Sequence, residues 1–243
     1  EGVKGELQSV ADAVLGTIDQ AVTSSLAEKV NAKRLAICAK DIPAIYGAMD
    51  GWGTTEKTIF STLRGMGAGH VKAFEYLWNS RKKHSIRWYF DDEMSGSDLS
   101  TALAYLNGNR AKALNLELKA SQGFFNDDEA RIEEVMRSAS AEELGELNKD
   151  YASTMSDVRG CLGGADLDAF NVLANEELSR EDAKLNADAI RLHEAMDGMG
   201  TDEEKVKSVL ESAKTPEQRE QLRAMYNQYA KSQFISCRMY ISY

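Results

Sequence analysis

The sequence is poor in residues that break helices or build disulfide frameworks. Its 243 residues include only two prolines and three cysteines. Cys38, Cys161 and Cys237 lie far apart and form no Cys-x-x-Cys pair, so we expect reduced residues rather than a disulfide scaffold. No apolar run is long enough to span a bilayer, and no signal-peptide pattern is present. These absences favour a cytoplasmic protein without a membrane-spanning helix.

Basic charge is scarce relative to acidic charge. The chain has 29 Lys and Arg against 39 Asp and Glu, which gives a net charge of −10. Nucleic-acid binders hold phosphates with clustered Lys and Arg, so we expect no nucleic-acid partner. The same charge disfavours direct adhesion to an anionic membrane unless a divalent cation bridges the two surfaces. The most basic run, residues 81–84, is typical of a solvated face.

Catalytic motifs are also missing. The sequence contains no nucleophile elbow, no phosphate-binding loop and no His-Glu-x-x-His. His70, His84 and His193 do not have the spacing of metal ligands, and the absence of an Asp-x-Asp-x-Asp-Gly loop excludes the classical EF-hand. We therefore expect no enzymatic activity.

The composition favours helices. Ala, Leu, Glu and Lys are frequent, and no alternating β-branched run indicates a sheet, so we predict an almost all-α chain. Residues 1–39 carry apolar positions spaced for one face of an amphipathic helix. These positions are Leu7, Val10, Ala11, Val14, Leu15, Ile18, Ala21 and Val22.

One eight-residue stretch occurs twice. Residues 49–56 read Met-Asp-Gly-Trp-Gly-Thr-Thr-Glu, and residues 196–203 read Met-Asp-Gly-Met-Gly-Thr-Asp-Glu. In both, a helical pattern ends at Met, two glycines break it, and a Thr can cap the next helix. Alternate glycines let the backbone take positive φ and present carbonyl oxygens toward one point. Oxygen ligands of this kind suit Ca²⁺, so each stretch predicts a helix-loop-helix with a cation site.

An acidic residue follows the first loop at a specific distance. Glu93 lies 39 residues after Thr54 and begins the tetrapeptide Glu-Met-Ser-Gly. With this spacing the sequence resembles the annexin family, including its giardin-like relatives. That family's repeat reads Met-Lys-Gly-x-Gly-Thr, then 38 residues, then Asp or Glu, typically followed by Leu-Ser-Gly. The resemblance implies stacked repeats of five short helices each.

The repeat period identifies a middle unit. Thr54 and Thr201 are 147 residues apart, or two periods of 73 and 74. Near residue 127 stands Phe-Phe-Asn-Asp-Asp-Glu, in which Phe124 and Asn126 replace the loop glycines. Cys161 falls where the distal acid is expected. We interpret this second repeat as structural, without a cation site.

The predicted fold is therefore an all-α, annexin-like stack of about three five-helix repeats, the last incomplete. In the third repeat the count that gave Glu93 reaches Tyr240, so that site is capped differently or the chain stops short of its cap. The predicted regions are 1–39, an N-terminal helical region or part of a preceding repeat; 40–107, a repeat with a complete calcium site; 108–179, a degenerate repeat; and 180–243, a repeat incomplete at its C-terminus.

The resemblance also implies the ligands of Ca²⁺. In the first repeat they are the carbonyl oxygens of Met49, Gly51 and Gly53 with the Glu93 carboxylate, and Thr54 and Glu56 form a weaker neighbouring site. In the third repeat they are Met196, Gly198 and Gly200, with Thr201 and Glu203 nearby. Trp52 and Met199, at the loop tips, are the expected membrane contacts.

Two functions remain open at this stage. The first is a calcium-dependent, non-enzymatic protein of annexin type that binds acidic phospholipid at the membrane periphery. Asp50 and Asp197, however, stand where the family usually has Lys or Arg, and an acid there repels lipid phosphate. The alternative is an annexin-like helical scaffold, cytoskeletal or within a larger protein, that binds protein partners with weak or no lipid affinity.

Overall fold

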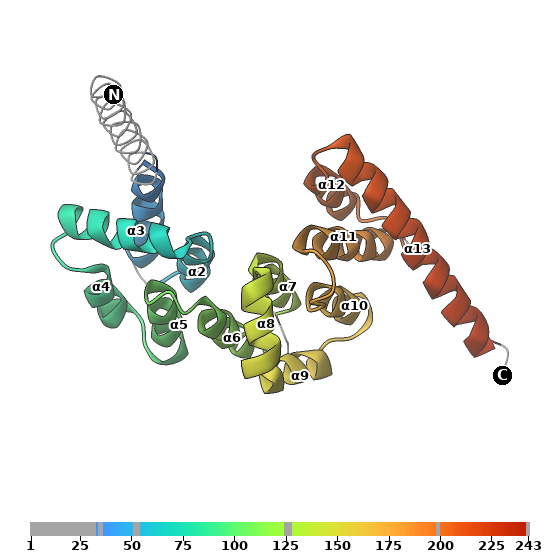
Figure 1. Cartoon of the computed structure of the whole chain (residues 1–243), viewed down its shortest axis with the longest axis horizontal. Helices are drawn as coiled ribbons and strands as arrows, with labels where there is room; N and C mark the ends of the chain where they lie inside the picture. The colour runs from blue at the N-terminus through green and yellow to red at the C-terminus, as the bar shows by residue number, and fades with distance from the viewer. Residues whose placement is uncertain (1–32, 34–35, 51–53, 124–127, 198–199, 242–243) are drawn as a thin grey trace, which may run out of the picture. The chain divides into compact units, whose positions relative to one another are not determined.

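The computed structural model describes residues 33, 36–50, 54–123, 128–197 and 200–241 (Figure 1). Every regular element in these residues is a helix, which confirms the all-α prediction. The chain divides into two compact units, Glu1–Gly108 and Asn109–Tyr243. The boundary between them lies one residue past the end of the first predicted repeat.

The described part of the first unit contains one set of five helices. Residues 36–49 form the first helix, and the others are α2 (Glu56–Arg64), α3 (Ala68–Arg81), α4 (Ile86–Glu93) and α5 (Gly96–Leu106). In the sequence, Asp41 followed by Pro43 predicts an N-cap, with the first helix from about Ile42 to Met49. That expectation is wrong, because the chain is already helical at residue 36, and Asp41 Oδ2 instead lies 2.9 Å from His70 Nε2 on α3.

An aromatic and aliphatic core joins these helices. Ile59, Phe60 and Leu63 on α2 are at most 1% exposed, as their spacing predicts. Trp78 on α3 is fully buried, and its indole N–H donates a hydrogen bond to the His84 carbonyl, 3.2 Å away. The pairs α2–α5 and α4–α5 pack against each other, so the fifth helix closes the unit around α2 and α4.

The second unit contains one further set of five helices and the start of another. The first set is α6 (Arg110–Ala120), α7 (Glu129–Ser138), α8 (Ala141–Asp150), α9 (Ala152–Cys161) and α10 (Gly164–Leu173). It is followed by α11 (Arg180–Met196), α12 (Glu203–Ser212) and α13 (Pro216–Ile241). In α13 the chain continues as one helix of 26 residues. None of the described helices is both long and apolar enough to cross a bilayer.

One backbone hydrogen bond recurs in all three repeats. It closes the loop between the first and second helices and has a length of 2.8 to 2.9 Å. The N–H groups of Thr55, Asp128 and Asp202 donate it to the carbonyls of Ala48, Ser121 and Ala195 respectively. Successive bonds are 73 and 74 residues apart, as the sequence period predicts.

The second helices begin one residue later than the loop motif suggested. Thr54 and Thr201 were expected as caps, but the N-cap residues are Thr55 and Asp202. The Asp202 carboxylate accepts a hydrogen bond from the Lys205 N–H at 2.9 Å, because a carboxylate satisfies the unpaired donors of a first turn. Thr54 is thereby left to contact another part of the first repeat.

Candidate functional site

The first loop is held at both ends. On its near side Met49 is only 5% exposed, and the Asp50 N–H donates to the Tyr46 carbonyl at 2.9 Å. On its far side the Thr55 N–H closes the loop onto Ala48. Gly51, Trp52 and Gly53 lie outside the described residues. The described residues on both sides of the loop are therefore anchored, and they include Met49, one of the predicted ligands.

The structure brings together two predicted ligands that are 39 residues apart. The Thr54 hydroxyl donates a hydrogen bond to the Glu93 carbonyl oxygen at 3.2 Å, and its oxygen lies 3.5 Å from Glu93 Oε2. The hydroxyl has a single proton, so the shorter contact to the backbone is the principal one. The distal acid thus lies beside the start of the loop motif.

The neighbours of Glu93 fix its position. Glu93 is the last residue of α4, and the next residue, Met94, is 6% exposed and donates its N–H to the Phe90 carbonyl at 2.9 Å. Gly96 then has φ of 58°, a left-handed conformation that disfavours other residues. Because Phe90 and Met94 are buried while Glu93 is exposed, the carboxylate is presented to solvent from an anchored turn.

The donor chemistry at this loop fits a hard cation. The described groups are the Met49 carbonyl at the helix end, the Thr54 hydroxyl, the partly buried Glu56 on the first turn of α2, and the exposed Glu93 carboxylate. All of them offer oxygen, the element that Ca²⁺ prefers. Within the described residues, no three His, Cys, Asp or Glu side chains converge on one point. A cation at this loop would therefore take most of its protein ligands from the backbone.

The loop of the third repeat differs in its surroundings. Met196 is 39% exposed, in contrast to the buried Met49, and Gly200, Thr201 and Glu203 are exposed as well. The Asp197 N–H donates to the His193 carbonyl at 2.8 Å, as the Asp50 N–H does to Tyr46. Gly198 and Met199 lie outside the described residues. In the first repeat a separate fourth helix, α4, ends at Glu93. In the third repeat the equivalent residues are part of the long helix α13. Among the described residues, therefore, no counterpart of Glu93 lies beside Thr201.

The second repeat keeps the frame of the site without its chemistry. Cys161 ends α9 as Glu93 ends α4, and Gly164 has φ of 55° where Gly96 has 58°. The exposed Cys161 thiol donates to the Val158 carbonyl at 3.2 Å. Residues 124–127 lie outside the described residues. The backbone of this junction is therefore retained while the carboxylate is replaced.

A charged network in the second unit was not found from the sequence. Arg191 on α11 contacts Glu133 on α7 at 2.5 Å and Asp166 on α10 at 2.6 Å. Arg137 contacts Asp188 at 2.7 Å and also pairs with Glu133. Burial opposes ionisation of Glu133, yet the two guanidinium groups hold the pKa of its carboxyl below the ordinary value. These charges pair with one another, so the network holds α11 against α7 and α10.

The network also extends to α12. Arg191 contacts Glu194 at 2.9 Å, and Glu194 in turn pairs with Lys205 on α12 at 2.8 Å. The Ser212 hydroxyl donates to Asp188 at 2.6 Å. The only sequence signal was the placement of acids and arginines on helical faces, which does not specify partners across repeats.

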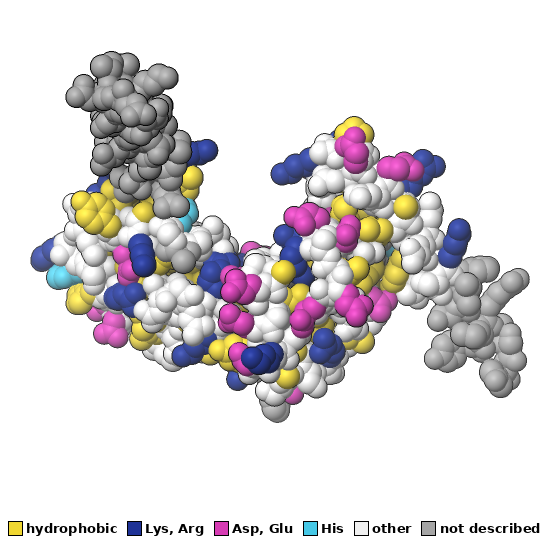
Figure 2. All heavy atoms as spheres, in the orientation of Figure 1, with side chains coloured by type: hydrophobic (Ala, Val, Ile, Leu, Met, Phe, Trp, Pro, Cys, Tyr) yellow, Lys and Arg dark blue, Asp and Glu magenta, His cyan; other side chains and the backbone are white. Residues whose placement is uncertain are grey.

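The other polar candidates are structural. In the basic run, Lys82 Nζ lies 3.1 Å from the centre of the Tyr46 ring, a cation–π contact. His193 packs edge-on against Tyr229, with ring centres 5.3 Å apart. Figure 2 shows acidic side chains interspersed with basic ones on the visible face of the described residues, rather than one broad basic surface.

Comparison with known proteins gives similarity in structure but not in sequence. No protein-family model matches the chain, and no curated protein matches it. Among solved structures, annexin III is 18% identical with a TM-score of 0.35, over 80% of this chain and 63% of that one. Chicken annexin V is 18% identical with a TM-score of 0.34, over 80% and 64%. Calcium-bound annexin (Sm)1 is 15% identical with a TM-score of 0.30, over 78% and 68%.

The chain therefore spans less than two thirds of the length of annexin III and annexin V. The repeat period is shown by the chain's own loop-closing hydrogen bonds. The chain is similar in structure to annexins over about 80% of its length.

Proposed function

We propose that this chain is a calcium-dependent, non-enzymatic protein of annexin type that binds acidic phospholipid surfaces from the cytoplasm. The observation that supports the proposal is the contact of Thr54 with Glu93 beside a loop closed by Thr55 and Ala48. It joins the two halves of the calcium motif that the sequence separates by 39 residues.

The first loop is the principal calcium site in this proposal. The carbonyls of Met49, Gly51 and Gly53 and the Glu93 carboxylate bind the ion, and Thr54 and Glu56 belong to a weaker neighbouring site. Ca²⁺ accepts six to eight oxygen ligands in a flexible shell. Positions not filled by protein then remain for water or for a lipid phosphate oxygen.

The third loop is a second, weaker site. It offers the carbonyls of Met196, Gly198 and Gly200, with Thr201 and Glu203 nearby, but no distal acid. Trp52 and Met199 contact the membrane interface from the tips of the two loops, where an amphipathic ring or a flexible thioether is well accommodated. With a net charge of −10, the protein needs the bound cations to approach an anionic surface.

Two measurements on the same protein test this proposal. Calorimetry measures Ca²⁺ binding to the wild type, to Glu93→Gln and to Asp91→Asn, a control that removes the same charge from an exposed position on the same helix. Co-sedimentation with phosphatidylserine and phosphatidylcholine vesicles is run with Ca²⁺ and with chelator. We expect calcium-dependent pelleting that Glu93→Gln weakens and Asp91→Asn retains; equal pelleting with Ca²⁺ and chelator would refute the function.

The second candidate function is a helical scaffold that binds protein partners. It is favoured by Asp50 and Asp197, both exposed at the ends of the helices that lead into the loops. Their carboxylates can join the shell of a cation but repel lipid phosphate. Calcium binding that depends on Glu93, without pelleting on any vesicle, would select the scaffold over the membrane-binding function.

A further inference from the structure

The helix α12 carries an apolar face that its own repeat does not cover. Leu210 is 49% exposed, whereas Val209 is 8% exposed and belongs to the core of the third repeat, against which the partly buried Val206 packs. A single exposed leucine is common on a protein surface, so its meaning here comes from the equivalent positions of the other repeats.

The two preceding repeats show which neighbour is missing. At the period of 73 and 74 residues, Leu210 corresponds to Met136 and Leu63, which are both 0% exposed. Val206 corresponds to Ile132 and Ile59, which are at most 1% exposed. In these repeats α7 packs against α10 and α2 against α5, so the fifth helix lies on the second. Among the described residues α12 has no such helix, because α13 continues to Ile241.

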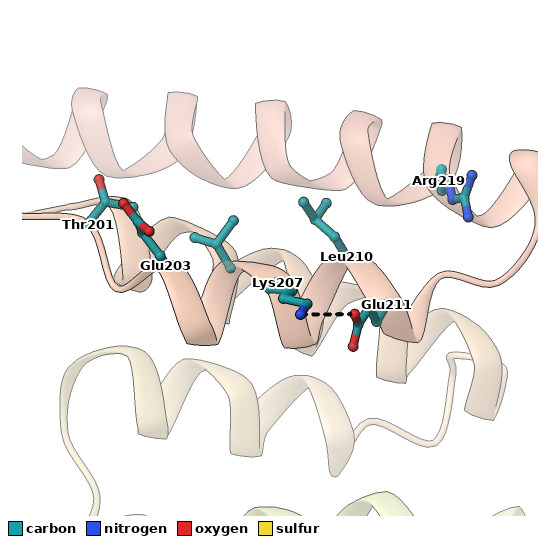
Figure 3. Close-up of a pocket in the computed structure, with 7 residues that line it drawn as sticks. Thr201, Glu203, Lys207, Leu210, Glu211 and Arg219 are labelled. Carbon is teal, nitrogen blue, oxygen red and sulfur yellow. Dashed lines mark ion pairs between the residues drawn. The ribbon is translucent and has the colours of Figure 1, made fainter.

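The uncovered face forms one side of a groove. The groove has a volume of about 530 Å³ and is lined by α12 and by the first turn of α13 (Figure 3). Val206 and Leu210 supply its apolar floor, and Lys207, Glu211 and Arg219 lie at its rim. Lys207 and Glu211 are 3.9 Å apart and largely exposed, so their pairing leaves the groove open.

The chain itself contains a segment with the pattern of a fifth helix. Counting 147 residues back from α10 gives residues 17–26, Thr-Ile-Asp-Gln-Ala-Val-Thr-Ser-Ser-Leu, which lie outside the described residues. The third residue of this segment is Asp19, and the third residues of α5 and α10 are also aspartates, Asp98 and Asp166. The segment ends in Leu26 as α10 ends in Leu173, and α5, which is one residue longer, ends in Leu106. The segment is amphipathic, with Ile18, Val22 and Leu26 spaced for one face.

We propose that residues 17–26 of a second copy of this chain dock as a helix in the groove of α12 and α13. Within the chain α10 packs against α11, the first helix of the next repeat. Residues 17–26 likewise precede the helix at 36–49, the first of their next repeat. Docking in trans therefore continues the repeat order of the chain, and it predicts self-association that depends on protein concentration. The contact is head-to-tail, so it can propagate beyond a dimer.

Charge is compatible with this docking. Asp19 is the only charged residue of the segment, and the rim of the groove offers Lys207 and Arg219. The recognition is that of an amphipathic helix in a groove, in which apolar anchors at helical spacing supply the affinity. The groove lies outside both proposed calcium sites except for Thr201 and Glu203 at its end, so self-association is expected without Ca²⁺.

Complementation between two variants of the full chain provides the test. Sedimentation velocity in chelator is measured over a concentration series for the wild type, Leu210→Glu, Val22→Glu and the control Tyr76→Glu. Tyr76 is 71% exposed on α3 and does not line the groove. We expect concentration-dependent association of the wild type and the control, with at least a tenfold loss in each of the other two variants.

A mixture of Leu210→Glu and Val22→Glu decides the geometry. The first variant keeps its segment and the second keeps its groove, so the equimolar mixture should form a dimer and nothing larger. Val22→Glu changes no described residue, which separates loss of docking from loss of folding. A wild type that stays monomeric at all concentrations, or a mixture that stays monomeric while the wild type associates, overturns the proposal.

Discussion

The first and third repeats share one loop motif but complete it differently. Both loops follow a helix ending in Met, both are closed by the same backbone hydrogen bond, and both carry Gly-x-Gly-Thr. Among the described residues only the first loop has a distal acid beside its Thr, because there the chain turns after the third helix and returns as α4. The glycine motif therefore forms the frame of the site, and the fourth helix brings its charged ligand.

The two repeats are also stabilised by different forces. The second helix of the first repeat buries an apolar face under α5. In the third repeat the corresponding helix, α12, is tied to α11 by the ion pair of Lys205 with Glu194 and the hydrogen bond of Ser212 with Asp188. Among the described residues no fifth helix covers α12, so its apolar face is only partly buried. Ion pairs and hydrogen bonds therefore contribute a larger share of the stability of its packing. This difference leads to a series of expected effects.

The largest effect should come from the equivalent leucines of the two repeats. Leu63→Ala removes a side chain that is 0% exposed and should lower the free energy of unfolding by about 2–5 kcal/mol. Leu210→Ala, at 49% exposure, should cost about 0.5–1 kcal/mol, since much of its surface is already in water. Urea denaturation followed by circular dichroism measures both. Equal losses would mean that Leu210 is covered in solution.

The charged network should give the next largest effect and a dependence on pH. Glu133→Gln removes the negative charge with which both Arg191 and Arg137 pair. This loss should lower the free energy of unfolding by about 1–3 kcal/mol. Because the pKa of Glu133 is lowered in the folded state, its contribution is present above its ordinary pKa of about 4.5 and is lost as the pH falls through the lower folded value.

Thermal unfolding at a series of pH values tests this dependence. The gap in unfolding free energy between wild type and Glu133→Gln should narrow below about pH 4.5, where the wild-type carboxyl also becomes neutral. Glu146→Gln, at an exposed position of α8, is the matched control and should show no such gap. A gap that stays constant from pH 7 to pH 3 would contradict the role of the ionised carboxylate.

The distal acid Glu93 should give the first loop a higher calcium affinity than the third. Glu93→Gln should weaken calcium binding by about tenfold, or 1.4 kcal/mol, because it removes the charged ligand of the first site. Glu203→Gln, in the third loop, should weaken the total binding by less than about threefold. Calorimetry with both variants checks the order. A larger loss in Glu203→Gln would make the third loop the principal site.

Sequence alone predicted the local frame of this molecule well. Helical spacing placed Ile59, Phe60 and Leu63 on a buried face, and the period of 73 and 74 residues reappears in the loop-closing hydrogen bonds. Such features depend on short-range geometry and on chain repetition, both of which are written in residue spacing. The pairing of Thr54 with Glu93 was instead indicated by the spacing that the first repeat shares with the annexin family, since the other two repeats lack the acid.

Features that depend on competition between partners were not predicted. Asp41 was expected to cap a helix but pairs with His70, because the chain is helical before it. Thr54 was also expected as a cap but donates to Glu93, and Asp202 displaces Thr201 at the third loop because a carboxylate caps at least as well as a hydroxyl. The network around Arg191 joins three helices from two repeats, and nothing in their separate patterns specifies it.

The smallest expected effect tests whether the Thr54 hydroxyl helps to position the carboxylate. Thr54→Val keeps the shape of the side chain and removes the hydrogen bond to the Glu93 carbonyl. The contact is exposed, so its loss should weaken calcium binding by about threefold, equal to less than 1 kcal/mol. Thr201→Val, whose hydroxyl has no acid of this kind beside it in the described structure, should leave affinity unchanged. Titration of both variants in the Glu203→Gln background isolates the first site, and an equal response to the two substitutions would mean that the threonine serves the loop alone.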